Sequence, residues 1–88
     1  MNILKKADEI INERSEEKLR EYGPIDDNIK NMVELFKIMS GKELSIEEGY
    51  MILICNKLAR QSFKHKEDNL LDLCAYTGAL NNYIEKKL

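Results

Sequence analysis

The 88-residue sequence is poor in the residues that build crosslinked or metal-bound folds, with one proline, one histidine and two cysteines. The two cysteines, Cys55 and Cys74, are too few for a disulfide framework and stay thiols in a reducing compartment. Both lie in apolar runs, so we expect two buried side chains. A zinc site needs four ligands, and with His65 as the single histidine we expect no metal or other cofactor.

Long apolar runs and an excess of positive charge are also missing. The longest uninterrupted apolar stretch, Tyr50 to Cys55, is far too short to span a bilayer. Met1 to Lys6 is not followed by the apolar segment of a signal peptide, so we expect a cytoplasmic protein without membrane contacts. The formal net charge of −2 gives no general attraction to a nucleic-acid backbone, which makes nucleic acid an unfavoured partner.

Apolar residues recur at helical spacing along the chain, and no alternating strand pattern is present. Gly23-Pro24 ends the first helix, Ser40-Gly41 ends the second, and Ser45 with Glu48 forms a capping box that starts the third. The predicted helices cover residues 3–22, 26 or 27 to about 39, 46–63, and 67 to at least 84. Short loops between four helices predict a compact all-α bundle in a single domain, residues 1–88.

The third and fourth predicted helices, residues 46–63 and 67–84, are apolar around much of their circumference and are expected to form a central antiparallel pair. Within this apolar background, Lys57 and Arg60 share one helix face, and Asp68 and Asp72 share another. Counting outward from the short turn places the two cations opposite the two carboxylates. We therefore expect Asp72 to form an ion pair with Lys57 or Arg60.

Two interpretations of these four charged residues remain open. In the first, they form an internal salt-bridge network that serves only the fold. In the second, they form the floor of a pocket in which Lys57 and Arg60 hold phosphate oxygens. The basic turn, residues 64–66, is either an exposed loop or an anion site at the start of the fourth helix. The tyrosines are either core residues or stacking surfaces for a base.

The sequence also carries a set of short motifs. These are Ala7-Asp8-Glu9-Ile10-Ile11, Tyr22-Gly23, Lys57-Leu58-Ala59-Arg60, Asp68-Asn69-Leu70-Leu71-Asp72, Tyr76 and Gly78-Ala79-Leu80. The set resembles a family of small helical phage and prophage proteins of unknown function. The resemblance covers nearly the whole chain and implies a compact α-fold that originated in a mobile element, in the cytoplasm of a bacterial host.

A weaker resemblance is to the all-α NTP pyrophosphatases, the MazG-like enzymes, which hold magnesium with an E-x-x-E motif and a later E-x-x-D motif. Glu13-x-x-Glu16 has the first spacing, and Asp72 matches the end of the second. Asn69 stands where the second motif has glutamate, so the metal site is incomplete. This resemblance implies a nucleotide-binding scaffold that has lost hydrolysis.

The favoured hypothesis is a non-catalytic protein that binds and sequesters a phosphorylated nucleotide, as a sponge for an immune signal. Lys57 and Arg60 would bind phosphate, Tyr22 or Tyr76 would stack on the base, and the two aspartates would orient the cations. The alternatives are a magnesium-dependent pyrophosphohydrolase and a module that inhibits a host protein. A homo-oligomer, most simply a dimer, is expected because the last helix has more apolar sides than three neighbours can cover.

Overall fold

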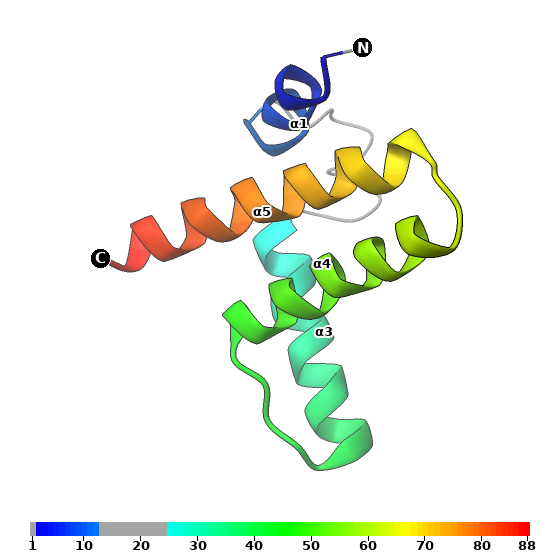
Figure 1. The fold of residues 1–88 in the computed structure, drawn as a ribbon. Helices are drawn as coiled ribbons and strands as arrows, with labels where there is room; N and C mark the ends of the chain where they lie inside the picture. The colour runs from blue at the N-terminus through cyan, green and yellow to red at the C-terminus, as the bar shows by residue number, and fades with distance from the viewer. Residues whose placement is uncertain (1, 13–24) are drawn as a thin grey trace.

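The computed structural model describes residues 2–12 and 25–88. Its elements are α1 (Ile3–Asn12), α3 (Ile25–Ser40), α4 (Ile46–Phe63) and α5 (Glu67–Lys87), and these ranges contain no strand (Figure 1). The predicted compact all-α bundle is therefore confirmed. The first predicted helix begins as expected at Ile3, whereas its second half, with Glu13, Glu16 and Tyr22, lies outside the described residues. In the described ranges, no helix combines the length and hydropathy that a bilayer crossing requires.

Local signals in the sequence set the start of α4 and the end of α3. Ser45 Oγ accepts a hydrogen bond from the Glu48 N–H at 3.0 Å, and Glu48 Oε1 accepts one from the Ser45 N–H at 2.9 Å. This is the predicted capping box, which satisfies two donors at the helix N-terminus. Gly41 follows α3 with a φ of 73° and donates its N–H to the Lys37 carbonyl, because glycine adopts this left-handed conformation at little cost.

The start of α3 differs from the prediction by one or two residues. Either Asp26 or Asp27 was expected to cap this helix, but it begins at Ile25 and both aspartates lie inside its first turn. Carboxylates are favourable at either place, because both positions lie near the positive end of the helix dipole. The sequence preference alone therefore does not distinguish a cap from a first-turn residue.

Helix α5 lies at the centre of the molecule, with α1 on one side and the antiparallel α4 on the other (Figure 1). On the α1 side, Ala7 packs against Leu71 and Ala75. On the other side, Ile29 of α3 and Tyr50 of α4 are fully buried against Ala79. The antiparallel α4–α5 pair is confirmed, but only α5 is central. Helix α4 is a surface helix whose opposite side is exposed to solvent.

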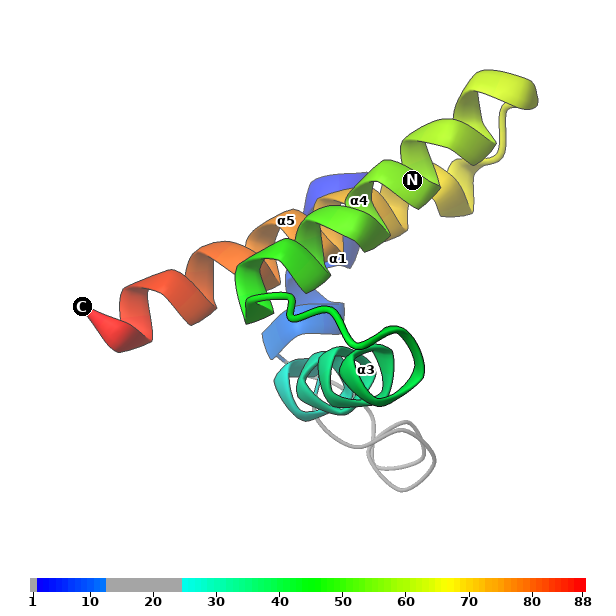
Figure 2. The same ribbon diagram turned by 90° about the horizontal axis from the view of Figure 1, so that it is seen from below.

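Helix α3 crosses α4 at a steep angle, and its C-terminal half projects beyond the α4–α5 pair (Figures 1 and 2). The two helices approach closely at Gly49, where an added Cβ would lie 3.0 Å from Val33 Cγ2 and 3.1 Å from Ile29 Cγ2. This crossing buries the N-terminal half of α3 and leaves the other half uncovered. Its exposed apolar side chains are Leu35, Phe36, Ile38 and Met39.

Large apolar side chains are exposed on α3 and α4 but not on α5. On α4 the exposed side chains are Met51, Ile52, Leu58 and Phe63. The uncovered apolar surface was expected on the last helix, and this expectation is wrong because α1, α3 and α4 together cover α5. Cys55 is also exposed on α4, which corrects the expectation of a buried thiol, whereas Cys74 is half-buried beside the α1-side cluster.

Candidate functional site

A cleft of about 540 Å³ lies where α4 turns into α5. Helix α4 contributes side chains from its last two turns, the connecting turn contributes two lysines, and α5 contributes its first two turns. The lining residues are Lys57, Arg60, Phe63, Lys64, Lys66, Asp68, Asn69 and Asp72. Four cations and two carboxylates thus surround the cleft in a chain whose overall net charge is −2. The predicted residues Lys57, Arg60, Asp68 and Asp72 are all brought together here.

Lys57 and Asp72 form the ion pair that the antiparallel register predicts. Lys57 Nζ lies 2.9 Å from Asp72 Oδ2, and the two side chains are 15% and 38% exposed. Because the Lys57 side chain is mostly buried, its ammonium group is held where an unpaired charge would be costly. This pair fixes one cation at the inner end of the cleft and neutralises most of its charge.

Arg60 and Asp68 do not repeat this arrangement. Both side chains are exposed, and Arg60 forms no ion pair with any residue in the described ranges. The expected two-by-two network is therefore half present. None of the described residues forms an ion pair with its N–H donors, and a guanidinium group can hold two phosphate oxygens at once.

The turn between α4 and α5 is held by the side chain of Gln61. Gln61 Oε1 accepts the Lys66 N–H at 3.1 Å, and Gln61 Nε2 lies 2.7 Å from His65 Nδ1. The Asn69 N–H in turn donates to the Lys66 carbonyl at 3.0 Å. These bonds fix the backbone of the turn, so Lys64 and Lys66 project from an ordered segment beside the N-terminus of α5.

The N-terminus of α5 adds a positive end to this cleft. Lys66 occupies the N-cap position, and its side chain makes no hydrogen bond to the helix. The first N–H groups of α5 therefore have no side-chain acceptor at the N-cap. Unsatisfied N–H groups and the helix dipole both favour an anion. The carboxylates of Glu67 and Asp68 in the first turn partly satisfy that preference.

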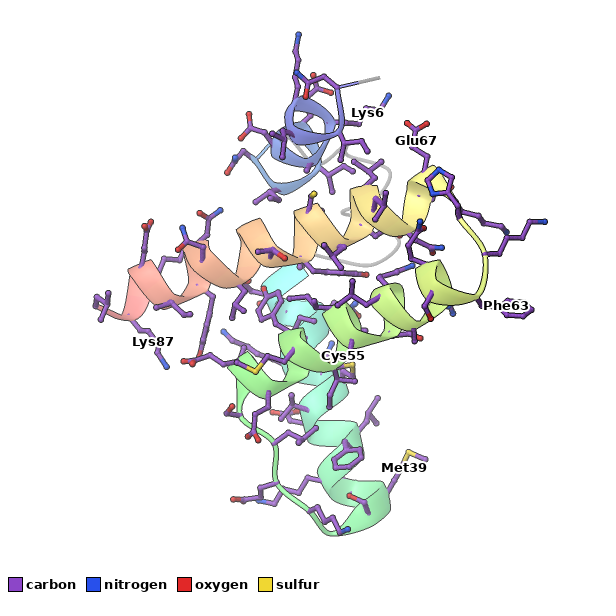
Figure 3. All side chains as sticks on the ribbon, in the orientation of Figure 1. Lys6, Met39, Cys55, Phe63, Glu67 and Lys87 are labelled. Atoms are coloured by element: carbon purple, nitrogen blue, oxygen red, sulfur yellow. The ribbon has the colours of Figure 1, made fainter. Side chains whose placement is uncertain are left out.

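The aromatic contact differs from the predicted one. Tyr76 is half-buried on α5 and does not line the cleft, and Tyr22 lies outside the described residues. The aromatic side chain at the rim is Phe63, which is 92% exposed and projects from the end of α4 (Figure 3). Phe63 is not among the predicted site residues, because in the sequence it continues the apolar helical pattern of α4. The basic turn was recognised as a possible anion site, but its place beside Lys57 and Arg60 follows only from the fold.

Tyr50 and Tyr83 have structural roles. Tyr50 is fully buried, its hydroxyl donates to Asp26, and its ring lies 6.3 Å from that of Tyr83. Burial raises the pKa of the Tyr50 hydroxyl well above its usual range, and the hydrogen bond to Asp26 adds to the shift. Tyr50 therefore belongs to the core that holds α3 and α4 together.

A second cleft, of about 400 Å³, lies between the start of α3 and the end of α5. Two of its three cations are engaged: Lys86 lies 3.6 Å from Asp26, and Lys87 pairs with Glu47 and lies 5.3 Å from the Tyr83 ring centroid. The third cation, Lys30, forms no ion pair within the described residues. Paired charges leave few donors for a ligand. The cleft at the α4–α5 turn has four cations, of which only Lys57 is paired within the part of the chain that the structure describes, and it is therefore the stronger candidate site.

A metal centre needs several ligand side chains close together. Within residues 2–12 and 25–88, no three His, Cys, Asp or Glu side chains lie close enough to hold a metal ion. Asp68 and Asp72 line the cleft with Asn69, a side chain that is 7% exposed, between them in sequence. Of these three side chains, Asp72 forms an ion pair, with Lys57, and within the described ranges no carboxylate cluster is present.

Comparison with known families gives one result that covers almost the whole chain. A family model described as a domain of unknown function, DUF6378, matches residues 2–84. The chain belongs to the DUF6378 family. This membership agrees with the predicted resemblance to a family of unknown function, and it covers every residue of the cleft. Comparisons of this DUF6378 chain with curated proteins and with solved structures gave no match.

Proposed function

We propose that this DUF6378 protein binds and sequesters a small phosphorylated nucleotide in the cleft at the α4–α5 turn, without hydrolysing it. The observation that carries the proposal is a cleft with four cations in a chain with a net negative charge; one of them, Arg60, is exposed and has no ion-pair partner among residues 2–12 and 25–88. The cleft volume of about 540 Å³ is within the usual range for small-molecule sites.

Each group has a distinct role in this proposal. Arg60 binds the phosphate with its bidentate fork, and Lys64 and Lys66 neutralise further phosphate oxygens near the N-terminus of α5. Lys57, held by Asp72, forms the inner wall and contributes a hydrogen-bond donor. Phe63 provides an exposed ring on which the base stacks, in place of the predicted tyrosines.

The proposed biological setting follows from the resemblance to small phage and prophage proteins. A nucleotide that binds without chemical change is removed from solution, which is the action of a sponge for a nucleotide immune signal in the cytoplasm of a bacterial host. The alternative activity is MazG-like hydrolysis, whose first acidic motif would be Glu13 and Glu16. The other alternative is inhibition of a host protein through an exposed apolar face of α3 or α4.

Isothermal titration calorimetry against a panel of linear and cyclic nucleotides tests the proposal. We expect one nucleotide to bind the parent protein, and Arg60→Gln to weaken that binding by at least tenfold while the fold survives, because Arg60 is exposed. Lys42→Gln removes an exposed cation outside the cleft and serves as the control. Absence of binding across the panel would refute the proposal, and release of pyrophosphate from a triphosphate with magnesium would support the enzyme instead.

A further inference from the structure

The side of α4 that faces away from α5 is apolar, although it is exposed to solvent. Its exposed apolar side chains include Met51 and Leu58, 52% and 51% exposed, and Ile52, 46% exposed. Figure 3 shows Cys55 on this side of the helix, pointing away from α5. A monomeric surface rarely presents so many apolar side chains in successive helical turns, so this face is expected to be covered in the assembled protein.

The spacing of this face matches a helix-pairing seam. The outward positions are Glu48, Met51, Cys55, Leu58 and Ser62, which alternate steps of three and four residues. Such a repeat keeps one stripe of a helix facing a partner helix along its whole length. Ile52 and Ala59 lie along one edge of this stripe and widen the apolar face.

The seam is symmetric about Cys55. Met51 and Ile52 precede Cys55 by one turn, and Leu58 and Ala59 follow it by one turn. Consider an antiparallel pair of identical helices with its two-fold axis at Cys55. Met51 of one copy then contacts Leu58 of the other copy, and Ile52 of one copy contacts Ala59 of the other. A patch that is its own complement about a two-fold axis is the defining property of an isologous dimer interface.

The charges at the ends of α4 favour the antiparallel orientation. Glu47 and Glu48 lie in the first turn, and Arg60 lies in the last turn, followed by Lys64. Antiparallel pairing places the acidic end of one helix level with the basic end of the other, while Arg60 and Lys64 themselves face the cleft. Parallel pairing would place like charges together at both ends, which is unfavourable.

We infer that α4 pairs with α4 of a second copy of this chain, antiparallel, about a two-fold axis at Cys55. The interface contains Met51, Leu58 and Cys55 along its centre and the flanking residues Ile52 and Ala59. It lies on the side of α4 opposite α5, whereas the anion cleft lies at the α4–α5 turn, so the two surfaces are compatible in one dimer.

Light scattering tests the existence of this pair. We expect the parent protein to show twice the mass of one 10.3 kDa chain at tens of micromolar, and Leu58→Glu to show the mass of one chain. Leu4→Glu places the same charge at a 74% exposed position on α1 and should leave the dimer unchanged. A single-chain mass for the parent, or a dimer that is lost in Met39→Glu on α3 but kept in Leu58→Glu, would overturn the inference.

Disulfide trapping tests the orientation. In the parent protein, oxidation should link the two copies through Cys55, and Cys55→Ser should abolish the link while Cys74→Ser retains it. With both native cysteines replaced by serine, Met51→Cys and Leu58→Cys should cross-link when the two variants are mixed. Neither should cross-link alone, because two copies of position 51 lie about 12 Å apart along an antiparallel pair, beyond disulfide reach. Efficient cross-linking of Met51→Cys alone would show a parallel pair and refute the antiparallel one.

Discussion

Lys57 and Arg60 lie one helical turn apart and face the same cleft, yet their surroundings differ. Lys57 is mostly buried and paired with Asp72, whereas Arg60 is exposed. The pairing could be predicted because an antiparallel helix pair with a short turn has a defined register. The exposure of Arg60 could not be predicted, because the helical period gives the direction of a side chain but not how deeply neighbouring elements bury it.

Replacement of Asp72 should show how much the buried lysine depends on its partner. We expect Asp72→Ala to lower the free energy of unfolding by about 2 kcal/mol, between the values for exposed and fully buried pairs, because it leaves Lys57 unpaired. Urea denaturation measures the change. Glu43→Ala breaks the exposed Lys37–Glu43 pair and is the control, for which we expect little change. Equal effects of the two substitutions would contradict the assigned burial of Lys57.

Tyr50 should make the stability of the fold decrease at high pH. Its pKa is raised in the folded state by burial, whereas an unfolded tyrosine ionises near pH 10. Below pH 10 the Tyr50 hydroxyl keeps its proton in both the folded and the unfolded state, and its full contribution to the free energy of unfolding is present. Above about pH 10 the unfolded state loses it first, so stability falls as pH rises toward the folded pKa, by up to about 1.4 kcal/mol per pH unit.

Comparison with Tyr50→Phe isolates this effect from other titrating groups. At pH 9 the parent should be more stable than the variant by about 1 kcal/mol, the value of the hydrogen bond to Asp26. Urea denaturation at pH 9, 10 and 11 should show this difference shrinking with pH. A difference that stays constant would mean that the Tyr50 hydroxyl ionises equally easily in both states.

At the scale of secondary structure, the sequence signals were strongest where a backbone group has a side-chain partner. The Ser45–Glu48 capping box predicted the start of α4 because each side chain satisfies a backbone donor of the other residue. The position of α5 at the centre was not predictable, because α4 is equally apolar. Which apolar faces are covered depends on how α1 and α3 pack, and that is a property of the tertiary structure.

The crossing of α3 over α4 depends on the absence of a side chain at Gly49. Gly49→Ala should improve helix propensity by about 1 kcal/mol. Its Cβ would however press against the branched side chains of Val33 and the fully buried Ile29 at 3.0–3.1 Å. Overpacking costs about 1–3 kcal/mol, so we expect a net loss of about 1 kcal/mol in urea denaturation.

Gly78→Ala is the matched control on α5. The added Cβ would meet mainly Ile11 Cδ1, the far end of a flexible side chain, which can move aside. We therefore expect the propensity gain and the repacking cost to nearly cancel in this variant. If Gly49→Ala were as stable as the parent, the close approach of α3 and α4 at this position would not be essential.

For the molecule as a whole, the core is small relative to the apolar surface that remains exposed. The buried apolar residues in the described ranges are Ala7, Ile29, Tyr50, Leu71, Ala75 and Ala79, so half of them are alanines. An 88-residue chain buries a modest share of its surface even when well packed. A second copy on α4 would cover large apolar side chains that the fold itself leaves in water.

Stability should therefore depend on protein concentration. If the pair of α4 helices forms only between folded chains, a hundredfold dilution removes about 2.7 kcal/mol of stabilisation per dimer. For a chain of this size, that corresponds to a decrease in Tm of about 5–10 °C, measured by circular dichroism at about 1 and 100 µM. Leu58→Glu, which prevents pairing, should unfold at the same temperature at both concentrations. A Tm of the parent that does not change on dilution would show that the monomer core is sufficient and that the exposed face of α4 adds nothing to the stability of the fold.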